Sequence, residues 1–255
     1  MPIDLQQILS HAFIIGLRVA GMMSFAPFLG NVSTPIAVRA GFTLALTALL
    51  YPVTAVPHLA LPPLAWTRLA LGEAVLGIAM GLCVQFIFEG AQLAGQVGGF
   101  QFAFSLVNVI DPTTNVDTPV LSTFHQLVVL LLFLHLNVHH WILRGLAKSF
   151  EYVPPGAFLV GPLALRDFLH DAGAMWLTGL QLATPILLAT VLIDVTIGFL
   201  SKAAPQMSAI FLSIPMKILV GYVVLSIALE LWPVFFEREF ALALGWSERL
   251  LRLSH

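Results

Sequence analysis

Apolar segments long enough to cross a lipid bilayer recur along this 255-residue chain, and this feature limits the possible folds more than any other. A bilayer-spanning helix needs roughly 20 predominantly apolar residues. Hydrophobic residues make up 59% of the chain and charged residues 9%, whereas a soluble domain carries roughly 25% charged residues. A soluble fold of this size could not hide so much apolar surface. We therefore expect an all-α integral membrane protein.

Proline and glycine divide the apolar runs into expected helices at about 12–30, 35–51, 66–88, 119–146, 174–200 and 207–236. The third of these can also continue beyond residue 88 through the glycines that follow. Thr34 can cap the second helix and Pro35 can take its first position. Only the stretch SKAAPQ, residues 201–206, separates the last two helices. So short a connection predicts an antiparallel helical hairpin.

The main interruption of the chain is EYVPPGAFLVGPLAL, in which proline and glycine cluster between Pro154 and Pro162. Such clusters mark turns and loops rather than helix interiors. We place a domain boundary near residue 165. It separates a helical part, 1–165, from a helical hairpin with a C-terminal tail, 166–255.

Small residues recur at every fourth position of the third helix, at Ala91, Gly95, Gly99 and Ala103. On a helix they form one smooth stripe, which lets helix backbones approach closely in a membrane. Gly77 and Gly81 form a second, shorter stripe. The first stripe can pack within this chain or on a partner subunit, and the sequence favours neither.

The sequence FSLVNVIDPTTNVDTP, residues 104–119, cannot continue this helix, because Asp111-Pro112 is a turn signal and Pro119 restarts a helix. Irregular backbone at membrane depth is tolerated only where it is buried in protein or lines a cavity. The polar side chains just before it must likewise face protein or water, namely Glu89, Gln92, Gln96 and Gln101.

The same segment is too apolar for an ordinary extramembrane loop, since it contains Phe104, Leu106, Val107, Val109 and Ile110. We predict that this segment is a re-entrant plug, a hydrophobic loop that enters a pore and blocks it. The alternative is that the aromatic residues from Phe100 onward are simply the last turn of the third helix.

Glu73 and Asp194 lie inside apolar runs, where an ionisable residue is a functional candidate by default. Proton transfer is one role. Structural pairing with a basic residue such as Arg18, Arg68 or Lys217 is the role that we favour.

His135 and His139 stand four residues apart in HLNVHHW, a spacing that suits a metal. The stretch HLNVH lacks the glutamate of a metalloprotease motif, and no third ligand lies nearby. We favour a polar, interfacial helix end with Trp141 as an anchor. Because the chain has no nucleophile elbow or phosphate loop, we expect neither an enzyme nor a cofactor or metal. The net charge of −2 does not indicate a basic surface that would bind nucleic acid.

The central stretch from FEGAQLAGQVGGFQF to LLLFLHLNVHHWILRGLAKSF resembles the FliR family of flagellar export-gate proteins and its injectisome relatives in type III secretion. The matching positions are Gly95, Gly98, Gly99, Asp111, Pro112, Asn115, Pro119, Leu121, His139, Pro154 and Gly156. The later stretch KAAPQMSAIFLSIPMKILVG resembles the hairpin of the family, through Lys202, Pro205, Gln206, Phe211 and Pro215.

This resemblance implies a FliP-like part over 1–165, a FliQ-like hairpin over 166–255, and long kinked helices in a helical multi-subunit assembly. The expected partners are FliP, FliQ, and FlhB-like and FlhA-like components in the bacterial inner membrane at the flagellar basal body, where membrane lipid contacts the chain. Unfolded substrate proteins would pass through the central pore, and the loop 104–117 would close it. The family forms a cone partly above the bilayer plane, so the expected helices do not define a topology.

We therefore expect a flagellar export-gate subunit rather than an enzyme. An injectisome subunit is the nearest alternative. A small secondary transporter would instead use broken helices and the acids Glu73 and Asp194 for a substrate site at the midplane of the membrane. A third alternative is an intramembrane metalloprotease built on His135 and His139.

Overall fold

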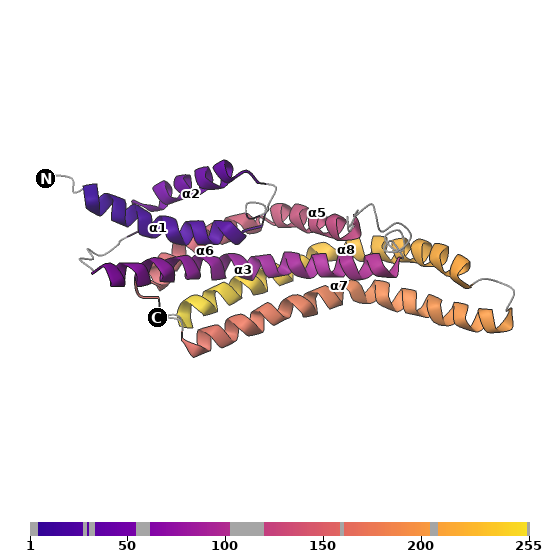
Figure 1. The fold of residues 1–255 in the computed structure, drawn as a ribbon. Coiled ribbons are helices and arrows are strands. Elements are labelled where there is room, and N and C mark those ends of the chain that lie inside the picture. Colours follow the sequence, from indigo (N-terminus) through magenta and orange to yellow (C-terminus); the bar gives the residue numbers. More distant parts are fainter. Residues whose placement is uncertain are drawn as a thin grey trace, which may run out of the picture. The chain divides into compact units, whose positions relative to one another are not determined.

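The structure is a computed structural model that describes residues 5–27, 30, 34–54, 62–102, 120–158, 161–204 and 209–253. This part of the chain is helical, as predicted. Its helices are α1 (Leu5–Phe25), α2 (Ile36–Leu50), α3 (Pro63–Gln101), α5 (Val120–His135), α6 (Val138–Tyr152), α7 (Pro162–Ala203) and α8 (Ala209–Leu253) (Figure 1). Four helices are long and apolar enough to span a membrane, or five spans if α5 and α6 form one.

The chain forms two compact units that alternate along the sequence. The first comprises Met1–Ile87, Phe133–Gly173 and Glu239–His255, and the second comprises Phe88–Leu132 and Ala174–Arg238. Helices α3, α5, α7 and α8 therefore each contribute to both units. The division near residue 165, which we drew from the proline-glycine break in the chain, stays a prediction.

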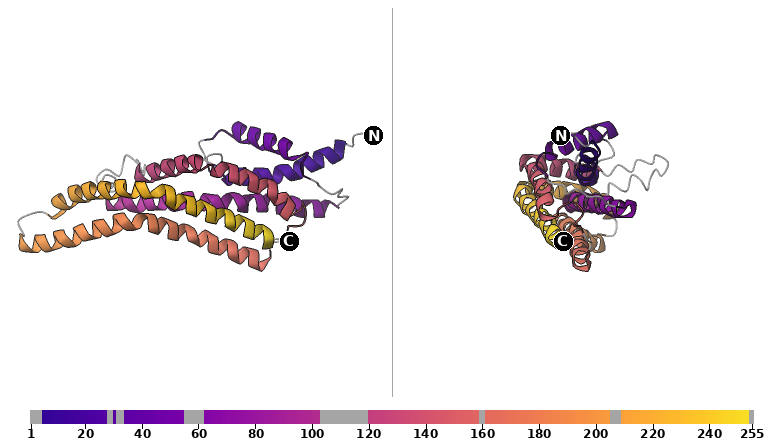
Figure 2. Two further views of the ribbon diagram at one scale, coloured as in Figure 1. Left: turned by 180° about the vertical axis from the view of Figure 1, so that it is seen from behind. Right: turned by 90° about the vertical axis from the view of Figure 1, so that its left-hand side faces the viewer.

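In the first unit, α1 and α2 lie side by side (Figures 1 and 2), and α1 packs closely on α3. The buried residues Ile15, Val19 and Met22 recur at helical spacing along α1. At Gly77 on α3, a Cβ atom would collide with the backbone carbonyl oxygen of Arg18. This glycine is therefore needed for the close approach of the two helices, which is how small residues act in membrane proteins.

In the second unit, the hairpin formed by α7 and α8 packs with the end of α3 and the start of α5 (Figure 2). Its buried side chains come from all four helices: Ala91, Ala94, Phe102, Leu121, Val129, Leu182, Ala183, Ile186, Leu225, Trp232 and Phe236. Pro185 lies inside α7, and Pro215 and Pro233 lie inside α8. Proline removes one backbone hydrogen bond from a helix and favours a kink.

Several predicted helix ends were wrong. Helix α1 ends at Phe25 rather than near residue 30, because Pro27 follows. Pro35 is the N-cap of α2 rather than its first helical residue, since its carbonyl accepts the N–H groups of Val38 and Arg39 at 3.0 and 3.3 Å.

The last two helices are also longer than predicted. The last apolar run of the sequence ends near residue 236, and we predicted the helix end there. Helix α8 instead continues to Leu253. Beyond residue 236 the sequence is amphipathic, and the buried side chains Phe240, Ala243, Trp246 and Leu250 return at helical spacing. Burial of one stripe therefore continues the helix beyond the uniformly apolar part.

The single helix predicted over 119–146 is also wrong. Helix α5 ends at His135, α6 begins at Val138, and the two axes differ by 67°. The cause is local, because Asn137 has a left-handed backbone with φ of 55°. Asparagine tolerates this conformation better than most residues.

The left-handed backbone at Asn137 yields a first prediction. We expect Asn137→Val to destabilise the protein by about 1–2 kcal/mol, because a β-branched side chain clashes in this conformation. Asn137→Gly is the matched control and should unfold close to the wild-type temperature. The measurement is thermal unfolding of the purified chain in mild detergent. An Asn137→Val variant as stable as the glycine variant would contradict the account of the bend.

Candidate functional site

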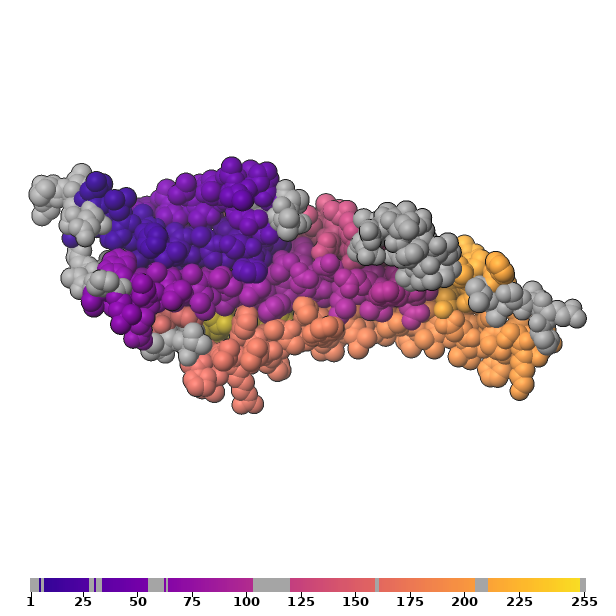
Figure 3. Space-filling model, viewed as in Figure 1, coloured from indigo at the N-terminus to yellow at the C-terminus, as the bar shows by residue number. Residues whose placement is uncertain are grey.

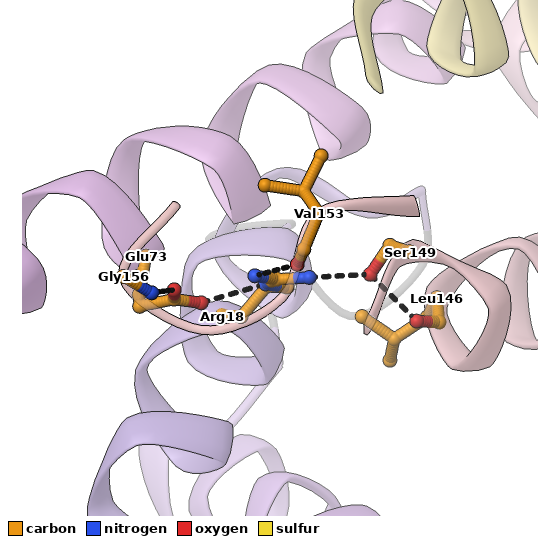
Figure 4. A network of polar contacts seen from close by, with 6 residues as sticks. All are labelled: Arg18, Glu73, Leu146, Ser149, Val153 and Gly156. Atoms are coloured by element: carbon orange, nitrogen blue, oxygen red, sulfur yellow. Dashed lines mark hydrogen bonds and ion pairs between the residues drawn. The ribbon is translucent and has the colours of Figure 1, made fainter. Parts of the chain in front are cut away.

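A fully buried ion pair lies in the first unit (Figure 4). The guanidinium of Arg18 on α1 donates from Nε to Oε2 of Glu73 on α3 at 2.7 Å, and both side chains are 0% exposed. The two terminal nitrogens of the Arg18 guanidinium donate to Ser149 in α6 and to Val153, the residue that follows α6. One bond reaches Oγ of Ser149 at 3.1 Å, and the other reaches the carbonyl oxygen of Val153 at 2.9 Å.

The same ion pair also binds the turn that follows α6. The backbone N–H of Gly156 donates to Oε1 of Glu73 at 3.1 Å, and Gly156 has φ of 87°, a conformation that favours glycine. The Arg18 guanidinium lies 4.2 Å from the ring centre of Phe150. Buried charges are tolerated when they are paired and hydrogen-bonded in this way. The network therefore connects α1, α3, α6 and the proline-glycine turn.

The pairing that we favoured for both intramembrane acids is confirmed. Glu73 pairs with Arg18. In the second unit, Asp194 on α7 pairs with Lys217 on α8, with 2.7 Å between Oδ1 and Nζ. Both acids therefore have basic partners within the chain.

A second cluster, in the second unit, joins the two helices that flank residues 103–119. We call it the loop base, and it consists of Gln92, Gly95, Phe102, Ser122 and Gln126. The hydroxyl of Ser122 on α5 donates to the carbonyl oxygen of Gln92 on α3 at 3.0 Å. The amide of Gln126 donates to Oε1 of Gln92 at 2.8 Å. A Cβ atom at Gly95 would collide with the Ser122 backbone, so α5 and α3 touch there directly.

Phe102, which directly follows α3, is the last described residue before the segment 103–119. Its backbone N–H donates to the carbonyl oxygen of Gly98 at 3.0 Å, which extends the last turn of α3. Its ring is fully buried, packs against Gly221 of α8, and lies 5.7 Å from the ring centre of Tyr222. The described residues on the two sides of 103–119 are thus fixed: Phe102 is buried, and the start of α5 is bonded to α3 through Ser122.

The structure locates only some of the predicted site residues. Phe100 lies in α3 and Phe102 directly follows it, so these two aromatics belong to the helix end. The predicted plug residues Phe104, Leu106, Val107, Val109, Ile110, Asp111, Pro112 and Asn115 lie outside the described residues, as do Pro205 and Gln206. The plug stays a prediction.

The remaining predicted residues lie in described helices. In the small-residue stripe, Ala91 and Gly95 are buried, and so is nearby Gly98, whereas Gly99 is partly exposed. Gly95 and Gly98 face α5 within the chain. The expected contact residues of the hairpin, Lys202, Phe211 and Pro215, are all exposed.

The loop base contains residues that our reading of the sequence missed. Ser122 and Gln126 stand four residues apart in an apolar helix, a spacing that places them on one face. His125 lies between them, donates from Nδ1 to the Leu121 carbonyl oxygen at 2.8 Å, and packs 4.9 Å from the ring centre of Trp232. Paired polar residues on an otherwise apolar helix face were the signal that could have identified this contact.

The histidines do not share a helix face. His135 is the last residue of α5 and His139 lies in α6, beyond the bend. The ring of His139 instead lies beside that of His140, with ring centres 4.1 Å apart and the planes tilted by 42°. Within the described residues, no group of three or more His, Cys, Asp or Glu side chains is placed to hold a metal ion.

The chain matches the family of bacterial export proteins, family 1, over residues 9–243, and it therefore belongs to this family. Its relatives include proteins named flagellar biosynthetic protein FliR. The Escherichia coli (strain K12) protein is 29% identical over 227 residues, which cover 88% of this chain and 86% of the relative. The Bacillus subtilis (strain 168) protein is 26% identical over 243 residues, with 94% of each chain covered. The Aquifex aeolicus (strain VF5) protein is 24% identical over 242 residues.

The resemblance to the FliR family is thus confirmed over most of the chain. The protein is a helical membrane protein of a family of bacterial export components, which is a transport class rather than an enzyme class.

The ion-pair network yields a second prediction. We expect Glu73→Gln to destabilise the protein by about 3–5 kcal/mol, because it leaves the Arg18 charge buried without its partner. The double variant Arg18→Met with Glu73→Gln removes both charges and should recover part of this loss. Thermal unfolding in mild detergent measures both effects. If the loss of stability in the double variant equals the sum of the losses in the two single variants, the two side chains do not act as a pair.

Proposed function

We propose that this protein is a subunit of the flagellar type III export gate, where it forms and closes the channel for unfolded substrate proteins together with FliP and FliQ. The observation that carries this proposal is the family match over residues 9–243, with FliR proteins among the relatives. The site of action would be the bacterial inner membrane at the flagellar basal body, beside FlhB-like and FlhA-like components.

In this proposal, the segment 104–117 is the seal. The loop base supports this role, because it gives the segment two anchored ends within one compact unit. A seal must stop ions when closed and admit an extended chain or a single helix, roughly 10–12 Å across, when open. A loop that rests on a rigid base can move without disturbing the helices that carry it. Gly95, Gly98 and Gly99 would let the helix end pack and shift.

The α7–α8 hairpin would contact the neighbouring subunits through Lys202, Pro205, Gln206, Phe211 and Pro215. Its exposed apolar side chains support this assignment, because large exposed apolar surfaces mark contacts with protein or membrane. The transporter alternative loses its main support, since Glu73 is fully buried in an ion pair and Asp194 is paired with Lys217. The relatives favour the flagellar over the injectisome assignment because they are named as flagellar proteins.

Co-purification tests the assignment to the gate. We expect the tagged chain, expressed with FliP and FliQ homologues and purified in mild detergent, to recover both in a fixed ratio. The intact mass of the complex gives that ratio. Recovery of the chain as a monomer or a simple homodimer would contradict the proposed function.

Loop replacement tests the seal. Replacement of residues 104–117 by a short Gly/Ser linker should leave assembly intact and let ions leak through the complex in a planar bilayer. The reason is that the loop base, which holds the flanking helices together, is unchanged. Replacement of residues 55–61 by the same kind of linker is the control and should not leak. A 104–117 variant that assembles normally but conducts no ions would refute the plug.

A further inference from the structure

A buried aromatic ring at the end of α3 fits into a notch on α8. We call this contact the Phe102 notch, and it consists of Phe102, Gly221 and Tyr222. A Cβ atom built on Gly221 would collide with the outer edge of the Phe102 ring. Gly221 is buried and the Phe102 ring is 0% exposed, so the ring has no open space beside it. The ring therefore occupies the volume that any other residue at position 221 would fill.

The Phe102 notch differs from two other glycine contacts of α3 in the second unit. Gly90 of α3 crosses Gly179 of α7, and a Cβ built on either would meet a backbone oxygen of the other helix at 2.9 Å. Gly95 meets the backbone of Ser122 on α5 in the same way. Such contacts fix one helix backbone against another. Figure 3 shows the magenta end of α3 directly against the orange surface of the hairpin.

A side-chain contact of this kind can open while the backbone contacts stay closed. A ring leaves a notch by a change of rotamer, whereas two touching backbones must separate as whole helices. Helix α8 has two places at which it can bend, because Pro215 and Pro233 lie on either side of Gly221. A bend at Pro215 would move Gly221 relative to Phe102, while α5 and α7 remain packed on α3.

We propose that Gly221 is a positioning residue for the seal. With the Phe102 ring in the notch, α8 holds the start of the segment 104–117 where it closes the channel, and withdrawal of the ring releases it. Phe102 stands two residues before this segment, so at most about 7 Å of chain separates them and a displacement of the ring is passed on. The inference rests on the proposed function, because it requires 104–117 to be the seal.

The test is ion conduction in a planar bilayer by the full chain assembled with FliP and FliQ homologues, compared between wild type and Gly221→Ala. The added methyl group takes the space of the ring edge. We therefore expect the conductance to rise at least about tenfold, at an unchanged assembly ratio, because the closed state loses its anchor.

Gly198→Ala is the matched control. Gly198 lies in α7 of the same unit, and among the described residues a Cβ built on it meets no neighbouring side chain or helix within 4 Å. Both substitutions replace a helical glycine by alanine, so their effects on helix propensity are alike. The Gly198 variant should conduct no more than wild type.

A double variant separates positioning from a general loss of stability. Phe102→Leu removes the ring atoms that the new methyl group would meet, so Gly221→Ala with Phe102→Leu should conduct less than Gly221→Ala alone. Two unrelated structural defects would instead add. A double variant that conducts at least as much as Gly221→Ala would therefore overturn the inference.

Two further results would also overturn it: a Gly221→Ala complex that assembles and conducts no more than wild type, or an equal leak in the Gly198 control. If the Gly221→Ala chain is not produced, Phe102→Leu alone decides. Leucine leaves part of the notch empty, so wild-type conductance in this variant would count against the inference.

The linker replacement of 104–117 is measured beside these variants. If it leaks while Gly221→Ala stays closed, only the role of Gly221 is wrong. If the linker replacement itself does not leak, the proposed seal is wrong, and the inference fails with it.

Discussion

The buried ion pair between Arg18 and Glu73 organises the first compact unit. A charge in an apolar interior is stable only when its partner and its remaining hydrogen bonds are in place. Here those partners come from three helices and a turn, because Ser149, Val153 and Gly156 complete the network. The geometry of α1, α3 and α6 is thereby linked to a single polar cluster, while the surrounding apolar contacts could accommodate several packings.

The second unit uses uncharged polar contacts and close backbone packing for the same purpose. Gln92 accepts hydrogen bonds from Ser122 and Gln126, and Gly95 lets the backbone of α5 touch α3. Phe102 adds a buried aromatic anchor at the last turn of α3. Phe102 and the start of α5, which flank the proposed seal, are therefore held by the fold, which is the condition for a loop to open and close without unfolding its support.

Local sequence patterns predicted much of this arrangement and failed where packing decides. Apolar runs located the membrane-length helices, and the presence of acids inside those runs indicated that Glu73 and Asp194 are paired with basic residues. The bend at Asn137 was not predicted, because asparagine is compatible with helical as well as left-handed backbone and the local sequence does not select between them. The continuation of α8 past residue 236 was also missed, since it depends on burial of one stripe by other helices.

The sequence by itself determined the class of this protein: a helical membrane chain with a glycine-rich helix, whose motifs resemble those of the bacterial export family. The helical and apolar character follows from composition and periodicity, which are local, whereas the family follows from the resemblance of its ordered motifs to known proteins. Only the tertiary structure decided which basic residue neutralises which acid, and that α5 rather than a partner packs on Gly95. Such choices depend on contacts between residues far apart in the chain, and several pairings satisfy the same local pattern.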